Sequence, residues 1–398
     1  MSSNGFPRVG GGDVSAIEGE RLVHNSVYSD ERLFRREQRT LHSRVWQFVC
    51  HDSDLADEGD YLTTTVAGNP VVVTRGKDGA IRGMYNVCRH RGAQVMAGSG
   101  NCQVMRCPYH WWVYELDGGL RGLPGSPAYE GTGFTKENFG LVPIRTESLF
   151  GLHFVCADAD APSLIDFLGP DIVETLGKPL ADTPVEVIHT QSWDVPINWK
   201  LVAENQRDGY HVPFVHPIFR SASPASKYQL SANGHAVQAT KLDYERMPEE
   251  LKGATEYALP GFEGGGGYIM TLFPDLICQV RNNYFMLSSS VPKSVDLTVV
   301  TRRIFGVVGD DDERRKVRML SADATSLSSY EHEDMPVLMR QRAGLDNWAV
   351  PYSLIARGAN ATEGTRGDDN RLRQWWQYWR NYVGVDTNRS PYAEEWEA

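Results

Sequence analysis

Two short motifs of cysteine and histidine constrain this chain more than any other feature of its sequence. One reads Cys-Arg-His at residues 88–90, and the other reads Cys-Pro-Tyr-His at residues 107–110. Sixteen residues separate the motifs, and each motif brings a thiol and an imidazole together on a tight loop. Thiolates and imidazoles are preferred ligands of zinc and of iron–sulfur clusters. The pattern therefore predicts a metal site, and the surrounding segment has to fold around it.

Zinc and a [2Fe-2S] cluster are the two candidate occupants of this site. A Cys2His2 zinc site usually takes both cysteines from one loop and both histidines from a helix. Here each loop supplies one ligand of each kind, as in a cluster where two histidines replace two cysteines on one iron. The motifs also lie among short β-type runs such as Thr63–Val66 and Val71–Thr74. Such runs, interrupted by Gly and Asn-Pro, indicate a small all-β module and favour the cluster.

A second concentration of ligand-type side chains lies in the middle of the chain. Glu204, Asp208 and His211 would share one face of a helix, because their spacing is i, i+4 and i+7. His211 and His216 would point in different directions on a straight helix, but Pro213 breaks the helix between them and lets both rings turn inward. Two histidines with one carboxylate form the facial triad of non-haem Fe(II) oxygenases. The segment therefore predicts part of an iron site.

Together these motifs resemble the Rieske non-haem iron aromatic ring-hydroxylating oxygenases, and in general the large subunits that act on benzoate, salicylate or terephthalate. The resemblance rests on Cys-Arg-His-Arg-Gly-Ala at 88–93, Cys-Pro-Tyr-His-Trp-Trp at 107–112 and Glu-Asn-Gln-Arg-Asp-Gly-Tyr-His at 204–211. It implies that Cys88 and Cys107 hold the inner iron of a [2Fe-2S] cluster, and that His90 and His110 hold the outer iron.

The resemblance also implies a mononuclear iron held by His211, His216 and a carboxylate from a helix further along the chain. Asp334, in the sequence Glu-His-Glu-Asp at 331–334, is the expected third ligand. Glu333 would point about 100° around the helix and Glu331 lies one turn earlier, so both are fallback ligands.

Asp208 matches the acid that bridges the two metal centres in this family. The resemblance implies a trimer in which the cluster of one subunit faces the mononuclear iron of its neighbour. Asp208 would then hydrogen-bond His110 of the adjacent subunit and His211 of its own subunit. The alternative is that Asp208 only orients His211. We expect a homotrimer or an α3β3 assembly with a small β subunit.

The expected fold is α+β, with a helix-grip type catalytic domain. We expect an N-terminal lead-in and helix over 1–42, an all-β Rieske domain over 43–158 and a catalytic domain over 159–398, whose antiparallel sheet is covered by helices. Helical patterns lie at about 30–49, 162–176, 199–209, 312–330 and 371–383, and strand patterns lie at 185–190, 268–272, 276–280, 284–288 and 297–304.

Charge and hydropathy limit the partners and the location. Lys and Arg number 40 against 51 Asp and Glu, and the resulting net charge of −11 would repel a nucleic acid backbone. The sequence offers no apolar run of the roughly 18 residues that cross a bilayer, and its start lacks the pattern of a signal peptide. We therefore expect a cytoplasmic protein without a nucleic acid or membrane partner.

The implied activity is that of a terminal oxygenase in aromatic compound catabolism. Electrons from NADH would arrive through a separate reductase, with or without a ferredoxin, and the iron would activate O2 for cis-dihydroxylation of an aromatic ring. A Rieske monooxygenase or an O- or N-demethylase would have the same metal sites. A binding protein with a degenerate iron site is a third hypothesis, which the full ligand set argues against.

The sequence leaves the substrate's charge open. A buried carboxylate would need an arginine partner. The segment expected near the pocket, Asn282–Ser290, carries no cation. Arg281 precedes it and Arg340, Arg342 and Arg357 follow it, but the sequence does not place them. A neutral or amine-bearing aromatic is therefore as credible as an aromatic acid.

Overall fold

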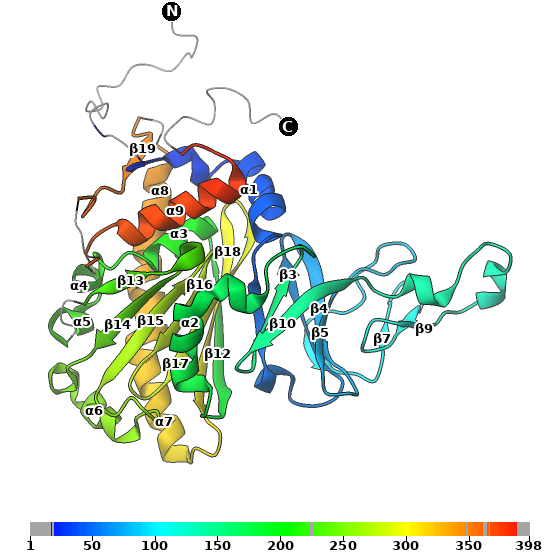
Figure 1. The fold of residues 1–398 in the computed structure, drawn as a ribbon, viewed down its shortest axis with the longest axis horizontal. Coiled ribbons are helices and arrows are strands. Elements are labelled where there is room, and N and C mark those ends of the chain that lie inside the picture. Colours follow the sequence, from blue (N-terminus) through cyan, green and yellow to red (C-terminus); the bar gives the residue numbers. More distant parts are fainter. Residues whose placement is uncertain are drawn as a thin grey trace, which may run out of the picture.

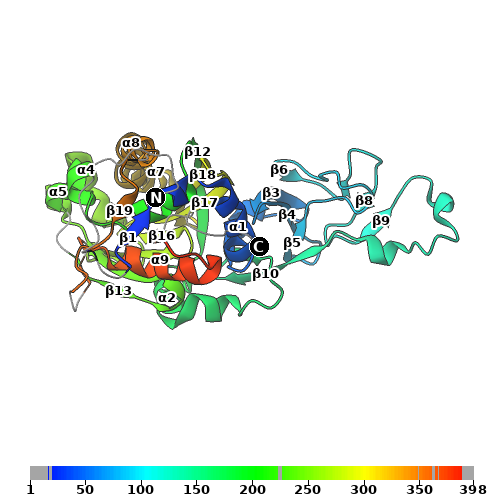
Figure 2. The same cartoon turned by 90° about the horizontal axis from the view of Figure 1, so that it is seen from above.

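The computed structural model describes residues 17, 20–222, 226–347, 349–360, 364–365 and 367–387. The molecule is elongated, with a smaller β domain beside a larger α+β domain along its long axis (Figures 1 and 2). This architecture confirms the expected α+β fold class. Most of the expected N-terminal lead-in lies outside the described residues.

The smaller domain is built on a seven-stranded sheet in the order β2-β11-β10-β5-β4-β3-β6. Its strands are β2 (Gln47–His51), β3 (Asp60–Val66), β4 (Asn69–Arg75), β5 (Ile81–Tyr85), β6 (Ser99–Asn101), β10 (Pro143–Leu149) and β11 (Leu152–Cys156). A small second sheet, formed by β7 (Met105–Arg106), β8 (Val113–Tyr114) and β9 (Leu120–Gly122), lies at the end remote from the larger domain (Figure 1). This remote end carries both cysteine–histidine motifs.

The larger domain contains an antiparallel seven-stranded sheet in the order β12-β18-β17-β16-β15-β14-β13. Its strands are β12 (Val185–Val195), β13 (Tyr228–Leu230), β14 (Ala236–Lys241), β15 (Gly266–Leu272), β16 (Leu276–Val280), β17 (Phe285–Ser294) and β18 (Leu297–Val307). β16 is buried along its whole length, which suits its apolar sequence and requires cover on both faces. The sheet is therefore the central layer of this domain.

Helices cover this sheet on both sides. They are α2 (Leu164–Leu180), α3 (Trp199–Asn205), α7 (Asp312–Ala322), α8 (Met335–Leu345) and α9 (Asn370–Val383), together with the short α4 (Val212–Val215), α5 (Pro217–Ala222) and α6 (Glu249–Lys252). α2 lies on one side of the sheet, whereas α7 and α8 lie on the other (Figures 1 and 2). α9 buries Trp375, Trp376 and Trp379 at helical spacing against the core.

The N-terminal helix is shorter than the sequence predicts. α1 (Glu31–Glu37) continues as a π-helical turn only to His42, and Gln47–His51 is a strand. The expectation of a helix to residue 49 is therefore wrong at its end. The apolar residues there pair as β2 with β11 and bury Cys50, so sheet pairing outweighs the helical pattern.

Two further helix ends differ from expectation. The helix expected to reach residue 209 ends at Asn205. The helix expected to end at residue 330 instead continues through two π-helical turns, Asp323–Leu327 and Tyr330–Asp334, into α8. Among the described residues, no helix combines the length and apolar character needed to span a bilayer.

Candidate metal centres and active-site pocket

The two cysteine–histidine motifs form a pair of equivalent loops. In the first loop the amide of Gly92 donates to the carbonyl of Cys88, at 3.0 Å, and in the second the amide of Trp111 donates to the carbonyl of Cys107, at 3.1 Å. Both donors have left-handed backbone conformations, with φ of 76° and 57°. Glycine adopts this conformation readily but tryptophan does not, so Trp111 holds local strain. The loops thus present their side chains as a matched pair.

The four predicted cluster ligands converge between these loops. Cys88 and Cys107 are buried, and the rings of His90 and His110 lie 4.6 Å apart, centre to centre, nearer the surface. Burial raises the pKa of the Cys107 thiol, so a metal ion would be needed to hold it as a thiolate. His90 Nδ1 is buried and has no hydrogen-bond partner among the described residues. This donor set fits a [2Fe-2S] cluster with buried cysteines and outward histidines.

Aromatic side chains enclose this site. Trp112 stacks parallel to the His90 ring at 5.1 Å, and Tyr109 packs on His110 at 3.7 Å. The hydroxyl of Tyr114 lies 3.2 Å from Cys88 Sγ. Hydrogen bonds to cluster sulfurs and exclusion of water both tune the reduction potential of such a centre.

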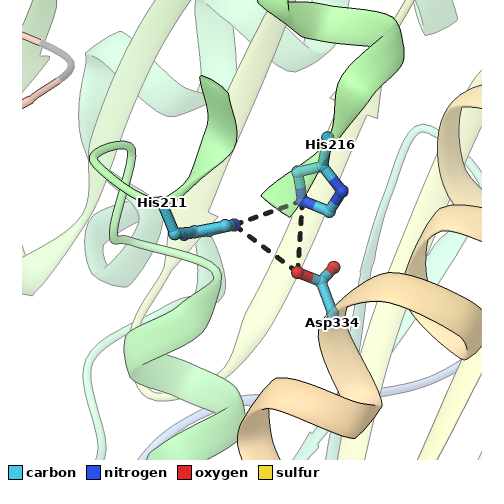
Figure 3. Close-up of side chains that lie close together, drawn as sticks. All are labelled: His211, His216 and Asp334. Atoms are coloured by element: carbon cyan, nitrogen blue, oxygen red, sulfur yellow. Dashed lines mark hydrogen bonds and ion pairs between the residues drawn. The ribbon is translucent and has the colours of Figure 1, made fainter. Parts of the chain in front are cut away.

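In the larger domain, His211, His216 and Asp334 point toward one another (Figure 3). His211 Nε2 and His216 Nε2 are 3.3 Å apart, and Asp334 Oδ1 lies 3.5 Å from the first and 3.2 Å from the second. Ligand atoms that are each about 2.1 Å from one metal ion, at angles of about 90–110°, would be separated by about 3.0–3.4 Å. The three side chains therefore fit one first-row metal ion and leave its other positions open.

The local backbone explains how these ligands meet, and it differs from the expected geometry. Pro213 lies inside α4, a single turn from Val212 to Val215, and does not break a helix between the histidines. His211 immediately precedes this turn, and His216 follows it in an extended conformation (φ −108°, ψ 97°). Because the chain leaves the helical path at His216, the two rings can point to the same side although they are five positions apart. Asp334 ends a π-helical turn, and such turns occur frequently at functional sites.

The Nδ1 atom of each histidine donates a hydrogen bond to a carboxylate. Asp208 Oδ2 accepts a hydrogen bond from His211 Nδ1 at 3.1 Å, and Glu333 Oε2 accepts one from His216 Nδ1 at 2.6 Å. Both contacts orient Nε2 toward the point where the ligand atoms of His211, His216 and Asp334 meet. Burial acts to raise the pKa of Asp208, but hydrogen bonds from His211 and from backbone amides lower it below its ordinary value. Asp208 therefore stays ionised.

The two fallback ligands, Glu333 and Glu331, make different contacts. Glu333 contacts His216 on the side opposite the shared centre, so its carboxylate supports a ligand. Glu331 accepts hydrogen bonds from Gln191 and Trp193 and points away. Glu331 is therefore placed to support β12, which carries both donors.

Glu204 does not join this site, contrary to the expectation of a shared helical face. Because the helix ends at Asn205, the chain turns before Asp208 and the faces no longer align. Glu204 is buried, where Tyr28 and Trp376 donate hydrogen bonds to it. Burial raises its pKa to about 7. Its role is to hold the N-terminal segment and α9 against α3.

A cavity of about 130 Å³ opens beside the triad. Asp208, His211, His216 and Asp334 form part of its wall, and Phe219, Ile269, Ile277 and Met286 supply apolar surface. A cavity of about 150 Å³ in another protein admits benzene, so this space suits a single aromatic ring.

Three arginines also line this cavity, and sequence reasoning missed two of them. They are Arg281 after β16, Arg302 in β18 and Arg371 at the start of α9. No local pattern marks Arg302 or Arg371, because only the folded sheet brings these elements together. The other arginines that the sequence raised do not line the cavity: Arg340 is exposed on α8, Arg342 pairs with Asp346, and Arg357 stacks over Tyr210.

Comparison with known proteins identifies the family of this chain. The Rieske [2Fe-2S] domain family matches residues 45–137, and the family of the ring-hydroxylating alpha subunit catalytic domain matches residues 183–384. The alpha subunit of 2-aminobenzenesulfonate 2,3-dioxygenase from Alcaligenes sp is 31% identical, over 94% of this chain and 96% of that protein. The chain belongs to the Rieske ring-hydroxylating oxygenases.

Two further similarities extend this comparison. The terminal oxygenase alpha subunit 2 of terephthalate 1,2-dioxygenase from Comamonas sp is 29% identical, over 90% of this chain and 95% of that protein. A solved structure of a quaternary ammonium Rieske monooxygenase has the same fold, with a TM-score of 0.77 at 22% identity, over 91% of this chain and 95% of that one. This oxidoreductase family carries a [2Fe-2S] cluster and a mononuclear iron.

Proposed function

We propose that this chain is a terminal oxygenase that performs cis-dihydroxylation of a single aromatic ring. The observation that carries the proposal is the cavity of about 130 Å³ that opens directly beside His211, His216 and Asp334. A bound ring would lie next to the coordination positions that these three side chains leave free. The apolar wall formed by Phe219, Ile269 and Met286 would exclude water from the ring.

In this proposal the chain's own residues have distinct tasks. Cys88, His90, Cys107 and His110 hold the [2Fe-2S] cluster, and His211, His216 and Asp334 hold the mononuclear iron. When bound, the cluster relays single electrons and the mononuclear iron activates O2. Asp208 and Glu333 keep the Nδ1 proton on each histidine, so that Nε2 is free to bind metal.

We further propose that electrons pass between subunits. The two centres lie at opposite ends of the long axis of the folded molecule, with β7 and β8 at one end and α4 at the other (Figures 1 and 2). Exposed aromatic side chains surround both ends: Tyr109 and Trp111 near the cluster, and Tyr210 and Phe214 near the iron. Such surfaces suit contact between copies in a trimer, with or without a β subunit.

Asp208 would be the polar link across that contact. It already binds His211 and is partly accessible, so His110 of a neighbouring copy could approach it. A separate reductase, with or without a ferredoxin, would supply electrons from NADH. The domain boundary would lie near residue 158, because β11 ends at Cys156 and α2 begins at Leu164.

A single-turnover experiment tests the proposed reaction. Chemically reduced holoenzyme is mixed with ¹⁸O2 and single-ring aromatics, and products are read by mass spectrometry. Two labelled oxygen atoms in one product are expected. One labelled atom, or loss of a methyl group, would contradict dihydroxylation and assign the chain to the monooxygenase or demethylase branch. The absence of oxygenated product from every ring tested would contradict dihydroxylation and also the monooxygenase or demethylase alternative.

A further inference from the structure

The cavity beside the triad contains buried cations without a matching acid. Arg281 and Arg302 are 7% and 8% exposed, and both line the cavity. Within the described part of the chain, neither has a carboxylate within 4.0 Å. A guanidinium cannot lose its charge at ordinary pH, so burying two of them together is costly unless an anion joins them.

The contacts of Arg302 leave part of its guanidinium available. One nitrogen donates to the Ser326 carbonyl, and the guanidinium lies 4.2 Å from the centre of the Tyr330 ring. Its Nε is buried and has no hydrogen-bond partner among the described residues. Burial lowers the pKa of Arg302, which reflects the cost of the buried charge. Asp334, the acid that acts on it electrostatically, faces the two histidines.

Arg281 and Arg371 surround the same space from other elements. Arg281 lies over the Phe219 ring at 5.4 Å, and the Gln279 amide positions it. Arg371 donates to Gln238 at 2.6 Å and lies over the Tyr228 ring at 4.7 Å. Polar and aromatic neighbours thus hold these cations in place, and no carboxylate among the described residues forms an ion pair with Arg281 or Arg302. Preorganised cations of this kind select anions.

We propose that Arg281 and Arg302 bind an anionic substituent, a carboxylate or a sulfonate, on the aromatic substrate of this pocket. The planar guanidinium offers paired donors that suit both oxyanions. The substituent would lie at the arginines and the ring would extend toward the iron triad. This inference rests on the proposed function, because it concerns the substrate of the same site. It disfavours cationic rings, which the three arginines would repel.

Binding measured without O2 tests this inference separately from the chemistry. Oxygen-free calorimetry on the holoenzyme compares benzoate with benzamide, and benzenesulfonate with benzenesulfonamide. Phenyltrimethylammonium serves as a cationic probe. We expect at least one anion to bind about 10-fold or more tightly than its amide, and the cation not to bind. The better anion identifies the substituent. Equal affinity for each acid and its amide, or no binding of either anion, would overturn the inference.

Variants locate the selectivity. Arg302→Gln and Arg281→Gln should each weaken anion binding by about 10- to 100-fold and leave amide binding unchanged. Arg302→Lys should restore part of the affinity, because it keeps the charge but not the paired donors. The matched control is Arg303→Gln. Arg303 is the next residue of β18 and pairs with Asp54 outside the cavity, so this variant should keep the anion preference.

The results separate the two proposals. Equal weakening of acid and amide in the Arg302 and Arg281 variants, with iron content intact, would overturn the anion assignment. Anion selectivity with no oxygenated product would leave this inference standing and contradict the proposed function. Oxygenation of neutral rings without any preference for anions would support the proposed function and overturn this inference.

Discussion

The two candidate metal centres differ most in how their ligands are distributed along the chain. The predicted cluster ligands all lie between residues 88 and 110, on two loops that repeat the same hydrogen-bonded turn. The predicted iron triad joins His211 and His216 to Asp334, roughly a hundred residues later, and its pocket adds arginines from three separate parts of the chain. The first centre is thus specified locally, whereas the second depends on the assembled sheet and helices.

This difference implies that each centre should lose its metal independently of the other. The cluster loops belong to the smaller domain and pack among their own aromatic neighbours. The triad is fixed by α4, by a π-helical turn and by two carboxylates of the larger domain. Losing a ligand at one centre should therefore leave the other centre intact.

The largest expected effect is a selective loss of iron. The wild-type chain should hold about three iron atoms. Asp334→Ala should retain about two, with an unchanged cluster absorption spectrum, because only the triad loses a ligand. Cys107→Ser should retain about one and lose that spectrum. Metal analysis with visible absorption measures both. Simultaneous loss of all iron in either variant would contradict the independence of the two centres.

A second change tests the proposed link between the centres. When it is reconstituted with excess Fe(II), Asp208→Asn should hold both metals but lower turnover by about 100-fold or more, because the amide cannot hold His211 and a neighbouring His110 in the same way. Steady-state product formation with reductase and NADH measures this effect. The control is reduction of the variant's cluster by the reductase, followed by visible absorption, which should match the wild-type protein because Asp208 lies beyond the cluster on the proposed electron path. Unchanged steady-state turnover would contradict the bridging role.

A third change sharpens the account of how the triad is supported. Glu333→Gln should weaken iron binding by about 10- to 100-fold, because the amide holds the His216 Nδ1 proton less strongly than a carboxylate does. Titration of the mononuclear site with Fe(II) measures this affinity. Glu331→Gln is the matched control, since Glu331 binds Gln191 and Trp193 and should leave iron affinity unchanged. Equal effects of the two variants on iron affinity would contradict a specific role of Glu333 in supporting His216.

The smallest expected effect concerns the cluster domain. Tyr114→Phe removes the hydroxyl that lies 3.2 Å from Cys88 Sγ. Loss of a hydrogen bond to a cluster sulfur should lower the reduction potential by tens of millivolts without loss of iron. Protein film voltammetry of the variant and the wild-type protein measures the shift. An unchanged or higher potential would contradict a hydrogen bond to sulfur.

Sequence reasoning succeeded where spacing alone carries the geometry. Both cysteine–histidine loops could be predicted because each is a short turn whose side chains meet through local hydrogen bonds. The convergence of His211 and His216 was also predicted, but for the wrong reason. Pro213 lies within a single helical turn instead of breaking a helix, and the rings meet because the chain becomes extended at His216, after that turn.

Reasoning from sequence failed where contacts depend on distant elements. Glu204 has helical spacing to Asp208, but the helix ends first and Glu204 is buried against Tyr28 and Trp376. Arg302 and Arg371 reach the pocket only after β18 and α9 are assembled around it. No local pattern encodes such contacts, which explains why the substrate's charge could not be read from the sequence.

Anomalous X-ray diffraction at the iron absorption edge, from crystals of the holoprotein, tests the ligand assignments most directly. The account predicts a two-iron peak between Cys88, His90, Cys107 and His110, and a separate single-iron peak between His211, His216 and Asp334. Iron bound by Glu333 in place of Asp334, or the absence of iron between the two histidines, would contradict it.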